Sequence, residues 1–134
     1  MAKPVYGSTN PSPAESESLQ RFGSVVGLAP EKEQLYRELH ADVWPEVLAT
    51  IEAANIRNYS IFRTELAGQV YLLSYFEYIG TSFEEDMAAM KQCPHTRKWW
   101  SLTDPCQRRL NGTPAEAQWL PAELVFHAGL AGSE

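Results

Sequence analysis

The order in which strand-like and helix-like patterns follow one another constrains the fold of this chain more than any other feature. Short runs rich in β-branched and aromatic residues are typical of strands, and a stripe of apolar residues with a period of about 3.6 is typical of a helix. The predicted strands cover residues 21–28, 55–63, 69–78 and 123–127, and the predicted helices begin at residues 30 and 82. The order β-α-β-β-α-β predicts an α+β fold of the ferredoxin-like class, an antiparallel sheet with its helices on one face.

Prolines divide both predicted helices. The apolar stripe of residues 35–51 contains Pro45. A proline removes one hydrogen bond and clashes with the carbonyl four residues earlier, so the helix is expected to kink or restart there. The second helix has Thr81 or Ser82 available as an N-cap, with a glutamate three residues after each, as a capping box requires. It is expected to resume after Pro94.

The 134 residues are enough for one domain with one core. Residues 1–20 hold three prolines and few apolar side chains, so they are expected to form a loosely packed or disordered N-terminal arm. Residues 21–134 are then expected to form the single ferredoxin-like domain. A sheet covered by helices on one side leaves its other face bare, which favours pairing with a second copy as a homodimer.

The net charge of −6 disfavours nucleic acid and anionic membranes as partners, because both would require a cationic surface. The apolar stretches, such as Val70–Leu73, are far shorter than the roughly 20 residues that span a bilayer. The two cysteines, Cys93 and Cys106, are interpreted as reduced thiols, and the expected location is the cytoplasm. Metal-ligand spacings such as CxxC or HExxH do not occur in the sequence, so no metal is expected.

Tyr36 and His40 lie four residues apart on the first predicted helix and therefore share one face of it. Both border the apolar stripe, which is where a helix edge would look into a pocket. The histidine side chain is a usable acid and base near neutral pH, because its ordinary pKa is about 6.5. Taken alone, His40 has a second interpretation as a half-buried histidine whose ring bonds a backbone carbonyl.

Trp99 and Trp100 are adjacent and cannot both point the same way from a regular element. One can belong to the core while the other lines a cleft, and indole rings suit the C–H faces of sugars. Tyr59, in the second predicted strand, either reaches a ligand on the sheet or packs against a partner. Further candidates, each with an ordinary structural alternative, are His95, His127, Arg57, Glu46 and Asp104.

As a set, these residues are far more specific than any one of them. Five segments belong to this set: the run that begins at His40 and continues as Trp44-Pro45-Glu46, the segment Asn58–Ile61, the pair Trp99-Trp100, the dipeptide Thr103-Asp104 and the terminal Val125-Phe126. Together they resemble the L-rhamnose mutarotase family. The resemblance extends from about residue 21 to about residue 130. It implies a ferredoxin-like homodimer that forms a dimeric α/β barrel and needs no metal or cofactor.

The resemblance also implies roles for individual residues and a substrate. His40 falls where the family has its acid–base histidine, and Tyr36, Tyr59, Trp99 and Trp100 match its sugar-contacting positions. The implied substrate is a small neutral monosaccharide, L-rhamnose or a similar 6-deoxy sugar, and the implied reaction is the interconversion of its α and β anomers. The sequence departs from the family in its N-terminal arm and in a longer stretch at residues 78–86, so L-fucose stays open as the substrate.

Opening a sugar ring requires a proton at the ring oxygen and the loss of one from the anomeric hydroxyl, and an imidazole can serve both needs. Two other functional classes stay open at this point. One is a dimeric barrel with monooxygenase or haem-degrading chemistry, in which His40 would ligate iron. The other is a sugar-binding module without catalysis.

Overall fold

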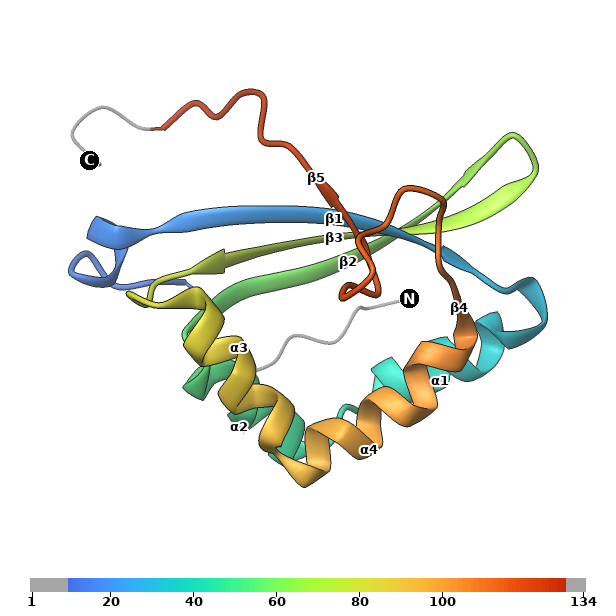
Figure 1. The fold of residues 1–134 in the computed structure, drawn as a ribbon, viewed down its shortest axis with the longest axis horizontal. Coiled ribbons are helices and arrows are strands. Elements are labelled where there is room, and N and C mark those ends of the chain that lie inside the picture. Colours follow the sequence, from blue (N-terminus) through green and yellow to red (C-terminus); the bar gives the residue numbers. More distant parts are fainter. Residues whose placement is uncertain (1–9, 130–134) are drawn as a thin grey trace.

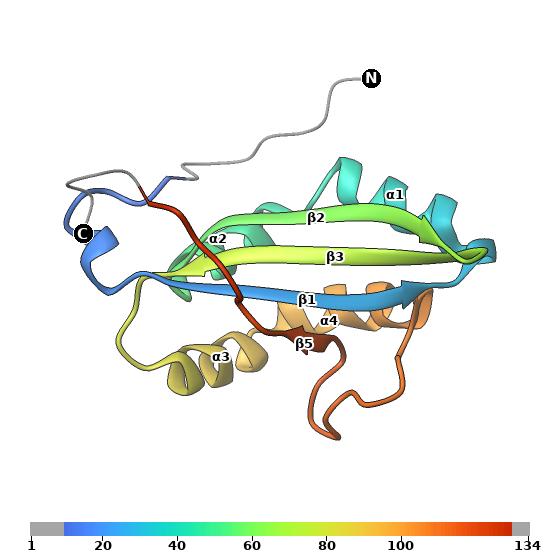
Figure 2. The same ribbon diagram turned by 90° about the horizontal axis from the view of Figure 1, so that it is seen from above.

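The computed structural model describes residues 10–129, which form a curled antiparallel sheet with the α-helices on one face (Figure 1). The strands are β1 (Gln20–Leu28), β2 (Ile56–Leu66), β3 (Gln69–Tyr78), β4 (Gln107–Arg108) and β5 (Leu120–Ala122). Their order across the sheet is β2-β3-β1-β4, and β5 also pairs with β1 (Figure 2). This order confirms the predicted ferredoxin-like arrangement of an α+β fold.

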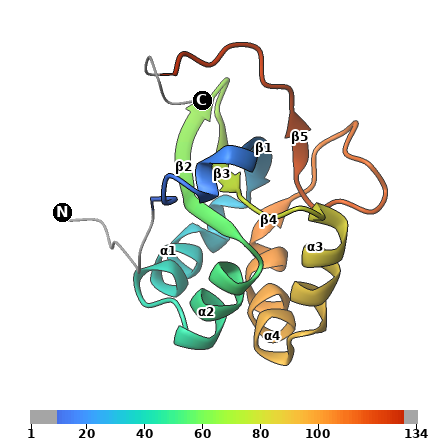
Figure 3. The same cartoon turned by 90° about the vertical axis from the view of Figure 1, so that its left-hand side faces the viewer.

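Each predicted helix is two helices, because a proline separates its halves. The first gives α1 (Glu33–Ala41) and α2 (Pro45–Ala53), and the second gives α3 (Phe83–Gln92) and α4 (Pro94–Thr103). Short 3-10 turns precede β1 at Glu15–Ser18, precede α1 at Pro30–Lys32 and follow α4 at Asp104–Cys106. Seen from the end of the sheet, α1 and α2 lie on the β2 side and α3 and α4 on the β1 side (Figure 3).

Pro45 makes the helix restart because of what it imposes on the residue before it. Trp44 is extended, with φ −62° and ψ 136°, and Pro45 occupies the first turn of α2. A residue before proline avoids the helical region, whereas a proline in the first helical turn lacks only a donor that has no intrahelical partner there. The sequence predicted either a kink or a restart of the helix at Pro45. The structure shows a restart, with α1 and α2 as separate helices.

The core lies between the helices and the central strands. Val26 and Leu28 of β1 and Leu72 of β3 are at most 3% exposed. Val70 of β3, Tyr36 from α1 and Cys106 from the turn after α4 complete this buried cluster. Because side chains alternate along a strand, the alternate residues of β1 and β3 point to the opposite, helix-free face.

A tight turn joins β2 to β3. Ala67 and Gly68 have φ values of +53° and +79°, and the flanking Leu66 and Gln69 pair directly. Two successive residues with positive φ form the turn type that matches the twist of a hairpin. The two strands predicted at residues 55–63 and 69–78 therefore form an antiparallel hairpin.

The predicted last strand at residues 123–127 is wrong. The strand that pairs with the edge of β1 is β5, and the chain leaves that edge after Ala122. Residues 123–129 are exposed and run above the helix-free face (Figures 1 and 2), with Val125 88% and Phe126 80% exposed. Their apolar composition resembles that of a strand. A strand also needs a neighbouring strand to which its backbone can hydrogen-bond, and residues 123–129 are not paired with any of the strands β1–β5.

Capping of helices also differs from expectation. Ser82 is the N-cap of α3 but makes no side-chain capping bond. Reciprocal bonds of the capping-box type occur instead between Ser12 and Glu15, with N···O distances of 2.9 and 3.2 Å. Glu15 also pairs with Arg57 of β2 at 3.3 Å. The rest of the predicted arm, residues 1–9, lies outside the described residues.

Within residues 10–129, none of the helices is long and apolar enough to cross a bilayer.

Candidate active site

His40 occupies the last turn of α1, between two aromatic rings. Its imidazole stacks on the Tyr36 ring with a centroid distance of 4.2 Å and meets the Trp99 ring edge-on at 5.3 Å. The side chain is half-buried. The structure therefore joins three of the predicted site residues, from α1 and α4, in one aromatic cluster.

The backbone fixes the orientation of the imidazole. His40 Nδ1 lies 2.9 Å from the carbonyl oxygen of Tyr36. A carbonyl oxygen can only accept a hydrogen bond, so Nδ1 donates and carries the proton. In the neutral ring the lone pair is then on Nε2, which makes Nε2 the proton-accepting atom. Burial lowers the pKa of His40 below its ordinary value, and the bond to Tyr36 opposes this shift.

Tyr36 is a neutral hydrogen-bonding group at this site. It is 5% exposed, and its hydroxyl accepts a bond from Gln107 Nε2 at 3.4 Å. Burial raises the pKa of Tyr36 far above its ordinary value, and the nearby Tyr59 raises it further. Asp104, which also interacts electrostatically with Tyr36, has a pKa that burial raises. Both groups thus hold protons more firmly than in water.

The two adjacent tryptophans differ in their surroundings. Trp99 is 6% exposed and contacts both His40 and Trp44, whose ring lies edge-on at 5.1 Å. Trp100 is half-buried and does not take part in the ring contacts found within residues 10–129. The buried ring is thus the one that touches the histidine.

A β-bulge determines where Tyr59 lies. The pairing of β2 with β3 shifts between Arg57 and Ser60, and Asn58 within this bulge has φ +51°. Asn58 Nδ2 donates to Glu77 Oε1 at 2.9 Å. Tyr59 consequently meets Phe76 on the helix-side face, with ring centroids 5.7 Å apart. The bulge brings Tyr59 to the side of the sheet that carries Tyr36.

Replacing Asn58 by alanine is expected to destabilise the protein by about 1–2 kcal/mol, because a Cβ without a compensating polar group disfavours positive φ. Replacement by glycine is expected to cost less, because glycine adopts this conformation freely. Urea unfolding of both variants measures the difference. Equal stability of the alanine and glycine variants would contradict the role assigned to the backbone at this position.

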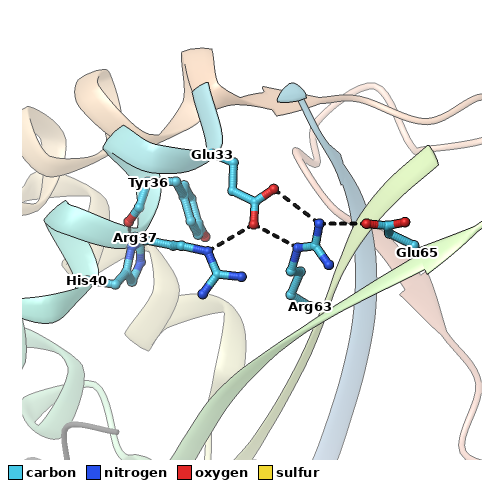
Figure 4. Close-up of polar contacts among 6 residues, drawn as sticks. All are labelled: Glu33, Tyr36, Arg37, His40, Arg63 and Glu65. Atoms are coloured by element: carbon cyan, nitrogen blue, oxygen red, sulfur yellow. Dashed lines mark hydrogen bonds and ion pairs between the residues drawn. The ribbon is translucent and has the colours of Figure 1, made fainter. Parts of the chain in front are cut away.

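An ion-pair network fastens α1 to β2 beside the cluster (Figure 4). Glu33 accepts from Arg37 at 2.9 Å and from Arg63 at 2.7 Å, and Arg63 also pairs with Glu65 at 3.0 Å. The hydrogen bond from Arg63 is the main reason why the pKa of Glu33 is lowered. Glu33 lies in the first turn of α1, one turn before Tyr36, so the network sets the position of the helix that carries the histidine.

Other candidates lie elsewhere. His95 is exposed at the start of α4, and His127 belongs to the exposed segment after β5. Arg57 pairs with Glu15, and Glu46 is exposed on α2. The residue that the sequence did not indicate is Gln107, which reaches Tyr36 across 71 positions of the chain. Groups of three or more metal-binding side chains do not occur within residues 10–129.

Comparison with known proteins gives a consistent result. A model of the L-rhamnose mutarotase family matches residues 21–128. The L-rhamnose mutarotase of Oceanobacillus iheyensis is 29% identical over 90 residues, which cover 67% of this chain and 82% of that protein. The enzyme of that name from Lactiplantibacillus plantarum is 31% identical over 85 residues, covering 63% of this chain and 77% of the relative.

The fold agrees as well. The crystal structure of an L-rhamnose mutarotase from Formosa agariphila superposes with a TM-score of 0.59 at 21% identity, covering 82% of this chain and 99% of that one. The family match spans β1, the helices, the hairpin and the aromatic cluster around His40, and it favours the sugar mutarotase over the monooxygenase alternative. The chain belongs to the L-rhamnose mutarotase family.

Proposed function

We propose that this chain interconverts the α and β anomers of L-rhamnose, with His40 as its acid–base group. The observation that carries the proposal is the half-buried imidazole, held by the Tyr36 carbonyl and flanked by the rings of Tyr36 and Trp99. Aromatic rings offer apolar faces to the C–H groups of a sugar, and a fixed tautomer aims one nitrogen at its hydroxyls.

The proposed reaction begins when His40 Nε2 accepts the proton of the anomeric hydroxyl. The electron pair forms the aldehyde carbonyl as the bond between C1 and the ring oxygen breaks, and the ring oxygen takes up a proton. Rotation about the C1–C2 bond presents the other carbonyl face, and closure reverses both proton transfers. Because Nδ1 is bound to a backbone carbonyl, the imidazole cannot use one nitrogen at the anomeric hydroxyl and the other at the ring oxygen. A second group must therefore exchange the proton at the ring oxygen.

The proposed sugar-binding residues are those that the family resemblance implies, namely Tyr36, Tyr59, Trp99 and Trp100. The raised pKa of Tyr36 suits a hydrogen-bond donor to a sugar hydroxyl and excludes a phenolate base near neutral pH. Tyr59 stands on the same side of the sheet. Since the substrate is uncharged, the proposal requires no cofactor or metal.

NMR saturation transfer between the two anomers tests the reaction and the sugar together, with L-rhamnose, L-fucose and D-glucose measured in parallel. Faster exchange of L-rhamnose than of the other two sugars is the expected result. If the anomers of L-fucose exchanged faster than those of the other two sugars, L-fucose would be identified as the substrate. Binding without acceleration of any sugar would identify a non-catalytic sugar-binding module.

The rate of exchange is expected to fall as the pH decreases, with a midpoint below the ordinary histidine pKa of about 6.5. Burial lowers the pKa of His40, so the neutral imidazole persists to lower pH than in water. Once protonated, Nε2 can no longer accept the anomeric proton. The pH profile of kcat/KM measures this limb, and a midpoint above 6.5 would contradict the assignment of His40 as base.

We also propose a homodimer, formed through the helix-free face of the sheet, in the cytoplasm. That face exposes Phe62, Leu66 and Leu73, which are 56%, 66% and 42% exposed. Exposed apolar patches of this kind mark interaction sites. Both cysteines are free thiols, which suits a reducing compartment.

Leu73→Glu is expected to convert the dimer to a monomer, because the charge would be buried in the proposed interface. Leu35→Glu is the matched control, since Leu35 on α1 is also 42% exposed but belongs to the helix layer. Sedimentation velocity distinguishes the two. A wild-type monomer, or equal effects of both substitutions, would contradict the proposed interface.

A further inference from the structure

Two glutamine side chains, Gln118 and Gln107, form a hydrogen-bonded chain that ends on the Tyr36 hydroxyl; we call this pair the amide relay. Gln118 Nε2 donates to Gln107 Oε1 at 3.0 Å, and Gln107 Nε2 donates to the Tyr36 hydroxyl at 3.4 Å. Both glutamines are half-buried, and Gln107 is held in β4 opposite Leu28 of β1. The relay therefore connects α1 with β4 and with the segment that leads into β5.

The two bonds determine which role is left for the Tyr36 hydroxyl. A glutamine amide carries its donor nitrogen and its acceptor oxygen on separate arms. Because the Gln107 oxygen accepts from Gln118, the Gln107 nitrogen is the arm that faces Tyr36. A hydroxyl that accepts a hydrogen bond keeps its own proton for another acceptor. Within residues 10–129, the bond from Gln107 is the one hydrogen bond that this hydroxyl makes.

The loop that carries Gln118 is fixed at both of its ends. It joins β4 to β5 (Figure 1) and begins with Arg109. The Arg109 guanidinium donates to the backbone carbonyl oxygens of three residues of the loop, Thr113, Pro114 and Ala117. Trp119, directly after Gln118, packs against the buried cluster that contains Tyr36. The backbone thus holds Gln118 where its side chain reaches Gln107.

We propose that Gln107 and Gln118 are positioning residues, which hold the Tyr36 hydroxyl as a hydrogen-bond donor to an oxygen atom of the bound sugar. The inference rests on the proposed function, since it takes the ligand of Tyr36 to be a monosaccharide. A free phenol can rotate and either donate or accept, whereas the relay leaves it only the donor role. The site then favours a sugar that presents a lone pair at this point over one that presents a proton.

The surroundings of Tyr36 agree with a donor that keeps its proton. Burial is the largest cause that raises the pKa of Tyr36, and the bond from Gln107 lowers it, as a donor to a phenol oxygen does. Asp104 and Tyr59 interact with the same group and raise its pKa further. His40 stacks on the ring of Tyr36 and bonds its backbone carbonyl. The relay and the proposed acid–base group therefore act on different atoms of Tyr36.

Gln118→Glu tests the direction of the relay. A carboxylate has no donor, so Gln107 is expected to turn its nitrogen toward position 118 and its oxygen toward Tyr36, which then donates to Gln107 instead of to the sugar. The KM for L-rhamnose is expected to rise about 3–10-fold, the usual value of one hydrogen bond, and kcat is expected to change less because His40 is untouched. Gln118→Leu removes the donor without reversing the relay and is expected to raise KM less.

Two further variants separate the relay from effects of charge and packing. Ala115→Glu adds the same charge to an exposed position of the same loop and is expected to leave KM unchanged. Gln107→Leu, added to Gln118→Glu, removes the new acceptor of the Tyr36 proton and is expected to bring KM back toward the wild-type value. Saturation transfer over a range of L-rhamnose concentrations gives KM and kcat. A merely structural role predicts the larger effect for Gln118→Leu, because Gln118→Glu preserves the shape of the side chain.

Equal KM values for Gln118→Glu and Gln118→Leu, or an equal rise in Ala115→Glu, would overturn the relay and leave the proposed mutarotase activity intact. A wild-type protein that accelerates the exchange of no sugar would overturn that activity, and with it the role of the relay toward a sugar. Ultraviolet resonance Raman spectroscopy of the sugar-free protein, with the spectrum of Tyr36→Phe subtracted, reads the hydroxyl without turnover. We expect an accepting hydroxyl in the wild type and one that only donates in Gln118→Glu. A hydroxyl that only donates in the wild type would overturn the proposal.

Discussion

Replacing His40 by asparagine is expected to slow the catalysed exchange of L-rhamnose anomers by about 10²–10⁴-fold, the usual contribution of a positioned acid–base group. Asparagine keeps a polar side chain beside the Tyr36 carbonyl but provides no group that titrates near neutral pH. Because His40 is only half-buried, the variant is expected to stay folded. Saturation transfer at a sugar concentration well above KM gives kcat directly.

His95→Asn is the matched control for this experiment. It removes an imidazole from the exposed start of α4 and leaves the aromatic cluster untouched. Its exchange rate is expected to equal that of the wild type. If His40→Asn retained full activity, or if both substitutions lowered it equally, the acid–base role would have to be assigned to another group.

Trp99→Ala is expected to have the largest effect on stability, about 3–5 kcal/mol, as for other buried aromatic residues truncated to alanine. The Trp99 ring is 6% exposed and supports both the His40 imidazole and the Trp44 indole. Its loss would leave a cavity behind the His40 ring, so activity should fall together with stability. Urea unfolding monitored by circular dichroism measures the first effect.

Trp100→Ala separates packing from sugar contact. Trp100 is only half-buried, so its truncation should cost less stability than that of Trp99. If it contacts the sugar as the family resemblance implies, affinity should fall by about 1–3 kcal/mol through lost apolar contact. Calorimetric titration with L-rhamnose measures this change. Equal losses of stability in the two variants would contradict the different surroundings of these rings.

The topology from β1 to α4 could be predicted from the sequence because the signals that carry it are local. Apolar runs of strand length, a stripe of helical period and a glycine-containing turn each depend on neighbouring residues, and their order leaves few arrangements. The location of Tyr36 and His40 on one helix face followed from their spacing of four residues. The tight turn at Ala67 and Gly68 is another local feature of this kind.

The features that sequence analysis missed depend on contacts between distant segments. In a strand that alternates regularly, Arg57 and Tyr59 would share one face, but the extra residue of the bulge at Asn58 places Arg57 opposite Glu77 and turns Tyr59 toward Phe76. Adjacent tryptophans give no local signal of which ring is buried. Gln107 is joined to Tyr36 only by the folded chain, so its role was beyond any spacing rule.

Pro45 acts on the candidate active site through the backbone. By denying Trp44 the helical conformation, the proline ring fixes the direction in which the chain enters α2, and so the place of the indole that contacts Trp99. A search for altered activity that varied only the residues of the aromatic cluster would overlook this position. Substitution of Pro45 would lift the restriction on Trp44 and is expected to change how its indole meets the Trp99 ring.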